Sequence, residues 1–194
     1  MGFGDAARAA EDKGDAIPQS RLTRLPLMRP LQRWARKARI RFFLPFLHRD
    51  DRILEVGSGD GWFRKAVESA MSVDYTTIDI DAPADIRDDI LNWRKHGLQP
   101  FSFDAIVAFE IVEHADCFRD IYELLRPGGL VLITTPMPHT DWLLKVLEGL
   151  RLTQKRTSAH DNLVYLVDIP GFNAEKTRNP FGLGQWGVFR KVTR

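Results

Sequence analysis

The feature that most constrains the fold is a glycine-rich turn, Gly57-Ser58-Gly59-Asp60-Gly61, which directly follows a short apolar segment. Beyond it, strand-like and helix-like patterns alternate, which favours an α/β fold with a mainly parallel sheet. Two segments separated by a Pro- and Gly-containing turn at the end of the chain predict an antiparallel hairpin. The predicted strands cover residues 52–56, 75–80, 84–90, 103–108, 130–135, 172–178 and 185–192. The predicted helices cover residues 62–70, 117–125 and 140–150.

The composition favours one domain with an N-terminal extension. The chain has 194 residues, of which 44% are hydrophobic, and this suits a single core. We interpret residues 1–20 as a flexible tail, residues 21–49 as a basic helical cap and residues 50–194 as the main domain. Cys117 is the single cysteine, so an intramolecular disulfide is excluded. The sequence shows no secretory signal and no long apolar run, and we expect a cytoplasmic protein.

The predicted cap concentrates positive charge. Eight basic residues and no acidic residue lie between Arg21 and Arg41. Between residues 30 and 47 the apolar positions follow helical spacing: Leu31, Trp34, Ala35, Ala38 and Phe42. Such a helix could contact anionic lipid, nucleic acid or an acidic substrate. Alternatively, the helix only covers the ligand site, and its basic side chains are simply exposed to solvent.

The turn and the acids around it predict a nucleoside ligand. Glycines let a ligand approach the backbone, and the next helix points its N-terminal N–H groups at it. Asp79 ends the next predicted strand, where a carboxylate can bind ribose hydroxyls. The G-x-G-x-G spacing differs from the dinucleotide pattern G-x-G-x-x-G. Glu55, two residues ahead of Gly57, suits a sulfonium or ammonium better than a pyrophosphate, which favours S-adenosylmethionine.

The sequence resembles class I S-adenosylmethionine-dependent methyltransferases over about residues 50–136. Residues 52–61 resemble the first motif of that family, and four later segments follow in the family's order: Thr77 to Ile80, Asp88 to Ile90, Phe103 to Val107 and Leu125 to Gly129. The chain is similar to methyltransferases of types 11 and 12, and in part to the O-methyltransferases of ubiquinone biosynthesis. The resemblance implies a Rossmann-like three-layer sandwich with a mostly parallel seven-stranded sheet and a C-terminal antiparallel hairpin.

The resemblance also implies a set of residues that bind S-adenosylmethionine. Glu55 and the turn would face the methionine part, Asp79 the ribose, and Asp89 with Ile90 the adenine. Asp81 competes with Asp79 for the ribose, and Asp85 and Asp88 offer alternatives to Asp89. The full predicted set is Glu55, Gly57, Ser58, Gly59, Gly61, Asp79, Ile80, Asp89, Ile90, Phe109 and Glu110.

The chain departs from the family's pattern after its second predicted strand. The family has a full helix between its second and third strands, whereas the sequence between Ile80 and Ile86 is too short for one. We expect a trimmed domain with a loop in place of that helix. The third strand would then be very short.

A divalent metal such as Mg²⁺ is a further possibility. Glu110, Glu113 and His114 could converge on one helical turn, and His160 could add a ligand. This set resembles metal-holding ubiquinone O-methyltransferases and enzymes that methylate the 3′-terminal 2′-hydroxyl of small RNAs. The same E-x-x-E-H stretch occurs in methyltransferases with no known metal. Without a metal, His114, His139 or His160 could act as the catalytic base.

The acceptor is the least determined part of the function. An Asn-Pro-Pro-Tyr-type motif, typical of amide and base N-methylation, is absent after the predicted strand 103–108. We therefore expect transfer to a small molecule, at a hydroxyl oxygen. The alternatives are an RNA-directed enzyme that uses the basic helix and a non-catalytic S-adenosylmethionine-binding protein. The sequence gives no oligomeric state.

Overall fold

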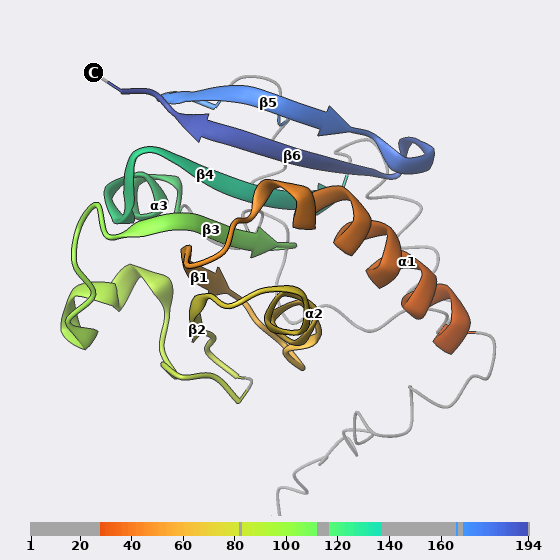
Figure 1. The fold of residues 1–194 in the computed structure, drawn as a ribbon, viewed down its shortest axis with the longest axis horizontal. Helices are drawn as coiled ribbons and strands as arrows, with labels where there is room; N and C mark the ends of the chain where they lie inside the picture. Colours follow the sequence, from red (N-terminus) through yellow and green to blue (C-terminus); the bar gives the residue numbers. More distant parts are fainter. Residues whose placement is uncertain (1–27, 82, 112–116, 137–165, 167–168, 194) are drawn as a thin grey trace, which may run out of the picture.

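The computed structural model describes residues 28–81, 83–111, 117–136, 166 and 169–193. The predicted tail 1–20 and the predicted helix 140–150 lie outside these residues. The described part is a layered α/β structure with a sheet between two sets of helices (Figure 1).

The sheet has six strands in the order β2-β1-β3-β4-β6-β5. The strands β1 to β4 are parallel, β6 runs antiparallel to both β4 and β5, and the last two strands form the predicted hairpin. Their bounds are β1 Arg52–Val56, β2 Asp74–Ile78, β3 Phe103–Phe109, β4 Leu125–Pro136, β5 Phe172–Arg178 and β6 Gly184–Lys191. The Rossmann-like, mostly parallel sheet is therefore confirmed.

The predicted seventh strand, residues 84–90, is the main difference from expectation. It is reduced to a single bridge between Ile86 and Ile78. The described residues between β2 and Ile90 contain no helix, so the predicted trimming is confirmed. The connection is too short for a helix and a strand, and side-chain hydrogen bonds hold it against β2 instead.

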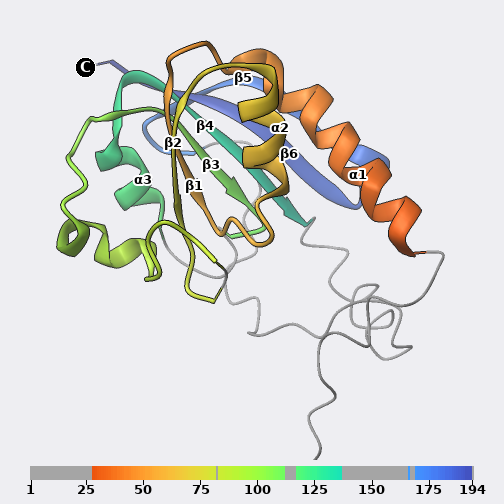
Figure 2. The ribbon, with the colours of Figure 1, turned by 60° about the horizontal axis from the view of Figure 1, so that its bottom comes forward.

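Helices cover both faces of the sheet (Figure 2). On one face, α1 (Met28–Phe43) and α2 (Trp62–Ala70) pack their apolar side chains on β1, β3 and β6. On the other face lie α3 (Phe118–Leu124) and the 3-10 helix η3 (Ile90–His96), with a second apolar cluster that includes Trp93. The chain thus buries two cores, one on each side of the sheet, as a three-layer sandwich requires.

The helix α1 largely follows its predicted pattern. Phe42 and Phe43 are buried at its end, where the short η2 (Leu44–Phe46) continues the chain. The prediction was wrong for Trp34, whose side chain is 52% exposed although its spacing matches the apolar positions. Ala38, by contrast, packs against the apolar cluster between α1 and the sheet, and Ala35 is half-buried.

Candidate functional site

The carboxyl ends of β1, β2 and β3 meet at one edge of the sheet, where ligands bind in open α/β folds. The strand β1 leads straight into the glycine turn. The N–H of Gly57 donates to the carbonyl of Ile78 at 2.9 Å, so the turn is joined to the end of β2. Glu110 follows the end of β3 at the same edge.

The glycine turn has a backbone that side chains would disturb. Gly57, Gly59 and Gly61 have φ of 72°, 54° and 67°, in the left-handed region that favours glycine. A Cβ on Gly57 would overlap the side chain of Ile111, whereas a Cβ on Gly59 or Gly61 would meet no atom within 4 Å. Gly61 is the N-cap of α2, so the space beside the turn also faces a helix N-terminus.

Two polar side chains complete the turn. Asp79 accepts a hydrogen bond from the Gly59 N–H at 3.0 Å through one oxygen, and from the Asp81 N–H at 3.0 Å through the other. Ser58 Oγ is buried and has no hydrogen-bond partner among the described residues. A buried hydroxyl is normally paired, so Ser58 and the open glycines fit a polar ligand at the turn.

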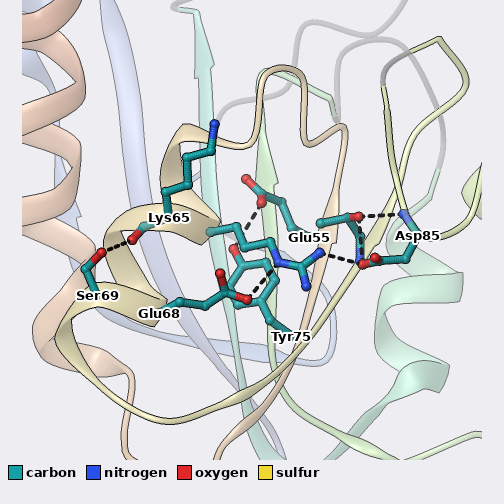
Figure 3. Close-up of polar contacts among 8 residues, drawn as sticks. Glu55, Lys65, Glu68, Ser69, Tyr75 and Asp85 are labelled. Carbon is teal, nitrogen blue, oxygen red and sulfur yellow. Dashed lines mark hydrogen bonds and ion pairs between the residues drawn. The ribbon is translucent and has the colours of Figure 1, made fainter.

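Glu55 is the buried acid of this site. Its side chain is 3% exposed, so it is not a surface acid, and Tyr75 donates a hydrogen bond to it at 3.1 Å (Figure 3). Burial raises the pKa of Glu55 to about 8, which the hydrogen bond from Tyr75 and the nearby charge of Arg64 offset in part. Near neutral pH the carboxyl is therefore mostly protonated, and a cationic ligand nearby would favour its ionised form.

Asp85 secures the trimmed connection beside the site. One carboxylate oxygen accepts from the backbone N–H and the hydroxyl of Thr77, both at 2.9 Å, and from Arg64 at 2.8 Å. Partial burial acts to raise its pKa, yet these hydrogen bonds outweigh it and hold the pKa of Asp85 below its usual value. Figure 3 shows the Asp85 side chain with dashed lines to its neighbours. The Asp85 carboxylate thus holds the connection after β2 against Thr77 and Arg64.

The predicted adenine side begins at the end of β2. Ile80 is 62% exposed, whereas Ile90 is buried in the core. Asp89 accepts from the Leu91 N–H at 2.9 Å and so caps η3, and Asp88 contacts Asn92 and His96 instead. Leu91, which no sequence motif indicates, is 49% exposed beside this cap. The sequence alone does not show that Ile90 is buried and Leu91 exposed, because that depends on the type of helix that the two residues begin.

Glu110 occupies a strained position at the end of β3. Its φ of 57° is unusual for a residue with a side chain. Its N–H donates to the Thr134 carbonyl at 2.8 Å, and its carboxylate accepts from the Thr134 hydroxyl at 2.9 Å and from Arg39 at 2.6 Å. Phe109, just before it, packs among Phe43, Trp62 and Phe63.

The helix α1 contributes residues that the motifs did not indicate. Arg39 binds Glu110, and Arg36 binds Asp60 of the glycine turn at 2.8 Å and lies over the ring of Trp62. Both arginines come from the basic cap, many residues away from the acids that they bind. Charge alone could not assign these partners, because the cap holds many cations.

A family model described as a methyltransferase domain matches residues 28–169. This match spans well over half of the chain, including α1. The chain belongs to the methyltransferase domain family. None of the curated proteins matches the chain.

Solved structures of other methyltransferases share the fold. The N-methyltransferase NodS from Bradyrhizobium japonicum, in complex with S-adenosylhomocysteine, is 14% identical with a TM-score of 0.57, over 84% of this chain and 89% of that one. A CurJ carbon methyltransferase is 17% identical with a TM-score of 0.55, over 75% and 49%. Phosphoethanolamine N-methyltransferase 2 from Haemonchus contortus, with phosphomonomethylethanolamine and S-adenosylhomocysteine, is 17% identical with a TM-score of 0.53, over 82% and 52%.

These similarities define the fold of the methyltransferase domain and little more. The chain spans about half the length of the CurJ and Haemonchus proteins. Their acceptors differ, since one is named a carbon methyltransferase and the other an N-methyltransferase. The resemblance to ubiquinone O-methyltransferases stays a prediction.

Several predicted catalytic and metal residues lie outside the described part of this methyltransferase domain: Glu113, His114, His139 and His160. Of the predicted metal set, Glu110 alone is described, and its carboxylate contacts Arg39. Within the described ranges, no group of three His, Cys, Asp or Glu side chains could hold a metal ion. No helix in those ranges is long and apolar enough to cross a membrane.

Proposed function

We propose that this protein transfers a methyl group from S-adenosylmethionine to a small-molecule acceptor. The observation that carries the proposal is the glycine turn after β1, which has open space beside it. Three left-handed glycines, two of them beside open space, stand next to a buried Ser58 hydroxyl that has no partner among the described residues. Asp79 is already oriented toward this turn by its bond to Gly59. The family match adds the expectation of a methyl donor.

Each part of the site has a role in this proposal. The glycine turn, Ser58 and Glu55 would hold the methionine end, and Asp79 would accept from the ribose hydroxyls. Ile80 would contact the adenine with its exposed side chain, beside Asp89 and Ile90. The bound cofactor supplies a methyl group on a sulfonium, which an acceptor attacks in line. The protein contributes positioning and exclusion of water, which lower the barrier without a covalent intermediate.

The acceptor atom in this proposal is a hydroxyl oxygen. Its support is the absence of an amide-methylating motif in the sequence after β3. A hydroxyl needs a base, and His114, His139 or His160 would take its proton, because imidazole titrates near neutral pH. A divalent ion on Glu110, Glu113, His114 and His160 is the alternative. It would lower the pKa of the acceptor hydroxyl, but it would have to compete with Arg39 for Glu110.

Calorimetric titration with S-adenosylhomocysteine tests the cofactor site. We expect the wild-type protein to bind it and Asp79→Asn to weaken binding at least about tenfold, since about 1.4 kcal/mol of charge-assisted hydrogen bonding is lost. The matched control is Asp81→Asn, which removes a neighbouring carboxylate that accepts no described hydrogen bond from the turn. Absence of binding to the wild-type protein, or an equal effect of both variants, would contradict the proposal.

Turnover with a panel of hydroxyl, amine and carbon acceptors tests the acceptor class. Methylated alcohols or phenols support the proposal, and exclusive methylation of amines or carbon acids overturns its oxygen part. The same assay in EDTA tests the metal. Loss of turnover that Mg²⁺ restores, together with an inactive Glu113→Ala, supports an ion. Full activity of the wild-type protein in EDTA and of Glu113→Ala overturns the metal alternative, and a histidine base then remains the proposal.

A further inference from the structure

The cations of α1 divide into two groups. Arg36 and Arg39 point to the site and pair with carboxylates. Arg33, Lys37 and Arg41 are exposed, and no carboxylate of the described residues lies within ion-pair distance of them. Their spacing of four residues places all three along one stripe of the helix. Among the described residues, no ion pair of this stripe holds α1 on the domain.

The strand β5 adds two cations on the same side of the sheet. Lys176 lies 5.4 Å from the ring centre of Phe42 and 5.7 Å from that of Phe46, so it sits at the end of α1. Arg178 lies 5.8 Å from the ring centre of Trp186, which itself packs against Phe42. Both cations are exposed. We call the set Arg33, Lys37, Arg41, Lys176 and Arg178 the basic face.

The described segments that carry or adjoin the basic face hold few acidic residues. The segments α1, η2 and β6 contain no Asp or Glu, and the one acid of β5, Glu175, pairs with Arg190. Because these segments come from opposite ends of the chain, the charge is a property of the folded surface. Like charges gathered this way repel one another, so the arrangement is costly unless an anionic partner covers it.

An exposed aromatic ring accompanies the charges. Trp34 is 52% exposed and lies three residues before Lys37 and seven before Arg41, which puts it on the same stripe. Cations lie over the rings of Phe42, Phe46 and Trp186. Bases of nucleic acids stack on open aromatic faces, and these three rings do not offer them. Tryptophan beside lysine and arginine is instead typical of helices that lie at a lipid headgroup layer.

We propose that the basic face binds the surface of an anionic lipid bilayer. The helix α1 lies along the membrane plane, Arg33, Lys37 and Arg41 contact headgroups, and Lys176 and Arg178 extend the contact onto the sheet edge. Trp34 enters the headgroup layer. Binding through this face would place the methyl-transfer site, which Arg36 and Arg39 join to the same helix, close to the lipid surface. The inference does not depend on methyl transfer.

Vesicle sedimentation of the full chain tests this inference. We expect binding to vesicles with about 30 mol% phosphatidylserine, little binding to pure phosphatidylcholine, and loss of binding at high salt. Lys37→Glu/Arg41→Glu should weaken binding about 25-fold, at about fivefold for each cation. The matched control is Arg87→Glu/Lys95→Glu, which makes the same change of net charge at exposed positions away from α1 and β5. Thermal midpoints verify that both variants fold.

The outcomes separate the possible partners. Equal loss of binding in both double variants, or no preference for phosphatidylserine, overturns the inference. A second titration uses a single-stranded RNA and a DNA duplex at the same salt. Tighter binding to either than to the vesicles, with the same dependence on Lys37 and Arg41, overturns it in favour of a nucleic-acid partner. Titration with S-adenosylhomocysteine is independent of all these results and reports on the proposed function alone.

Discussion

The two halves of the candidate site differ in how far their polar side chains are paired within the protein. At the ends of β1 and β2, Ser58 Oγ is buried without a hydrogen-bond partner among the described residues, and Glu55 is buried with a raised pKa. At the ends of β3 and β4, the charges are already satisfied, because Arg39 and Thr134 hold Glu110. The first half therefore contains buried polar groups that are costly in the free protein. The second half is held together by the protein's own N-terminal helix.

This difference predicts opposite responses to substitution. In the first half, removing a polar group should stabilise the free protein and weaken ligand binding. In the second half, removing a polar group should weaken both. A side chain that binds a ligand can thus be recognised when its removal raises the stability of the free protein and lowers the affinity for the ligand.

The largest expected effect is that of Gly57→Ala. Its left-handed backbone costs about 1–2 kcal/mol with a side chain, and its overlap with Ile111 adds about 1–3 kcal/mol. We expect a lower free energy of unfolding and no measurable binding of S-adenosylhomocysteine. The matched control is Gly128→Ala, at φ of 73° with no atom near its Cβ and at the opposite end of the strands. It should lose stability and keep its affinity, and equal loss of affinity in both would show that the turn is not the site.

The second prediction concerns Glu55→Gln and pH. The folded-state pKa of Glu55 is about 8 against an ordinary 4.5. Stability from this group is therefore complete below about pH 4.5 and is lost as the pH rises through 8. We expect Glu55→Gln to match the wild type in urea unfolding at pH 5 and to exceed it by a few kcal/mol at pH 9. Its affinity for S-adenosylmethionine should fall, because the sulfonium and ammonium lose an anionic neighbour.

Binding of S-adenosylmethionine should also release a proton from Glu55. Titrations near pH 7 in buffers of different ionisation enthalpy measure that proton. Identical pH dependence of unfolding in the wild type and in Glu55→Gln would show that the buried carboxyl does not titrate as described.

Ser58→Ala is expected to have a smaller effect of the same kind. A buried hydroxyl without a partner costs about 1–3 kcal/mol, so alanine should raise the thermal midpoint of the free protein. The affinity for S-adenosylhomocysteine should fall about fivefold or more, at about 1 kcal/mol for a lost hydrogen bond. A variant that is less stable and binds normally would mean that the hydroxyl is satisfied within the protein.

The second half is tested by Arg39→Met, with Arg36→Met as its control. Without Arg39, the strained Glu110 loses its strongest hydrogen bond, and we expect stability to fall by about 1 kcal/mol and cofactor affinity to fall with it. Arg39→Lys should restore part of both. The Arg36–Asp60 pair is more exposed, so Arg36→Met should change stability by less than about 0.5 kcal/mol. A gain of stability in Arg39→Met would contradict this prediction and would mean that Glu110 behaves like the residues of the first half.

The same contrast explains how much could be predicted from the sequence. The first half lies within one β-α-β unit, so local spacing indicated Gly57 to Gly61 and Asp79 as candidates. The mainly parallel sheet, the terminal hairpin and the trimmed connection followed from alternation and length. Arg39 could not be assigned to Glu110, because that pair depends on how α1 crosses the sheet. Trp34 was misplaced for the same reason, since helical spacing alone does not tell which neighbouring stripe meets the sheet.

The short connection after β2 has a consequence for solubility. In the described sheet, β2 and β5 are the two outer strands, and exposed strand edges invite pairing with other molecules. The Asp85 side chain accepts from the N–H of Thr77; the Ile86 N–H donates to the Thr77 carbonyl at 3.0 Å, and the Ile86 carbonyl accepts from the N–H of Asp79, just after β2, at 3.1 Å. On the other edge, β5 carries charged side chains and an irregularity between Ala174 and Lys176. Loss of the Asp85 side chain would therefore open an edge to fibril-like association, even in a protein that still folds.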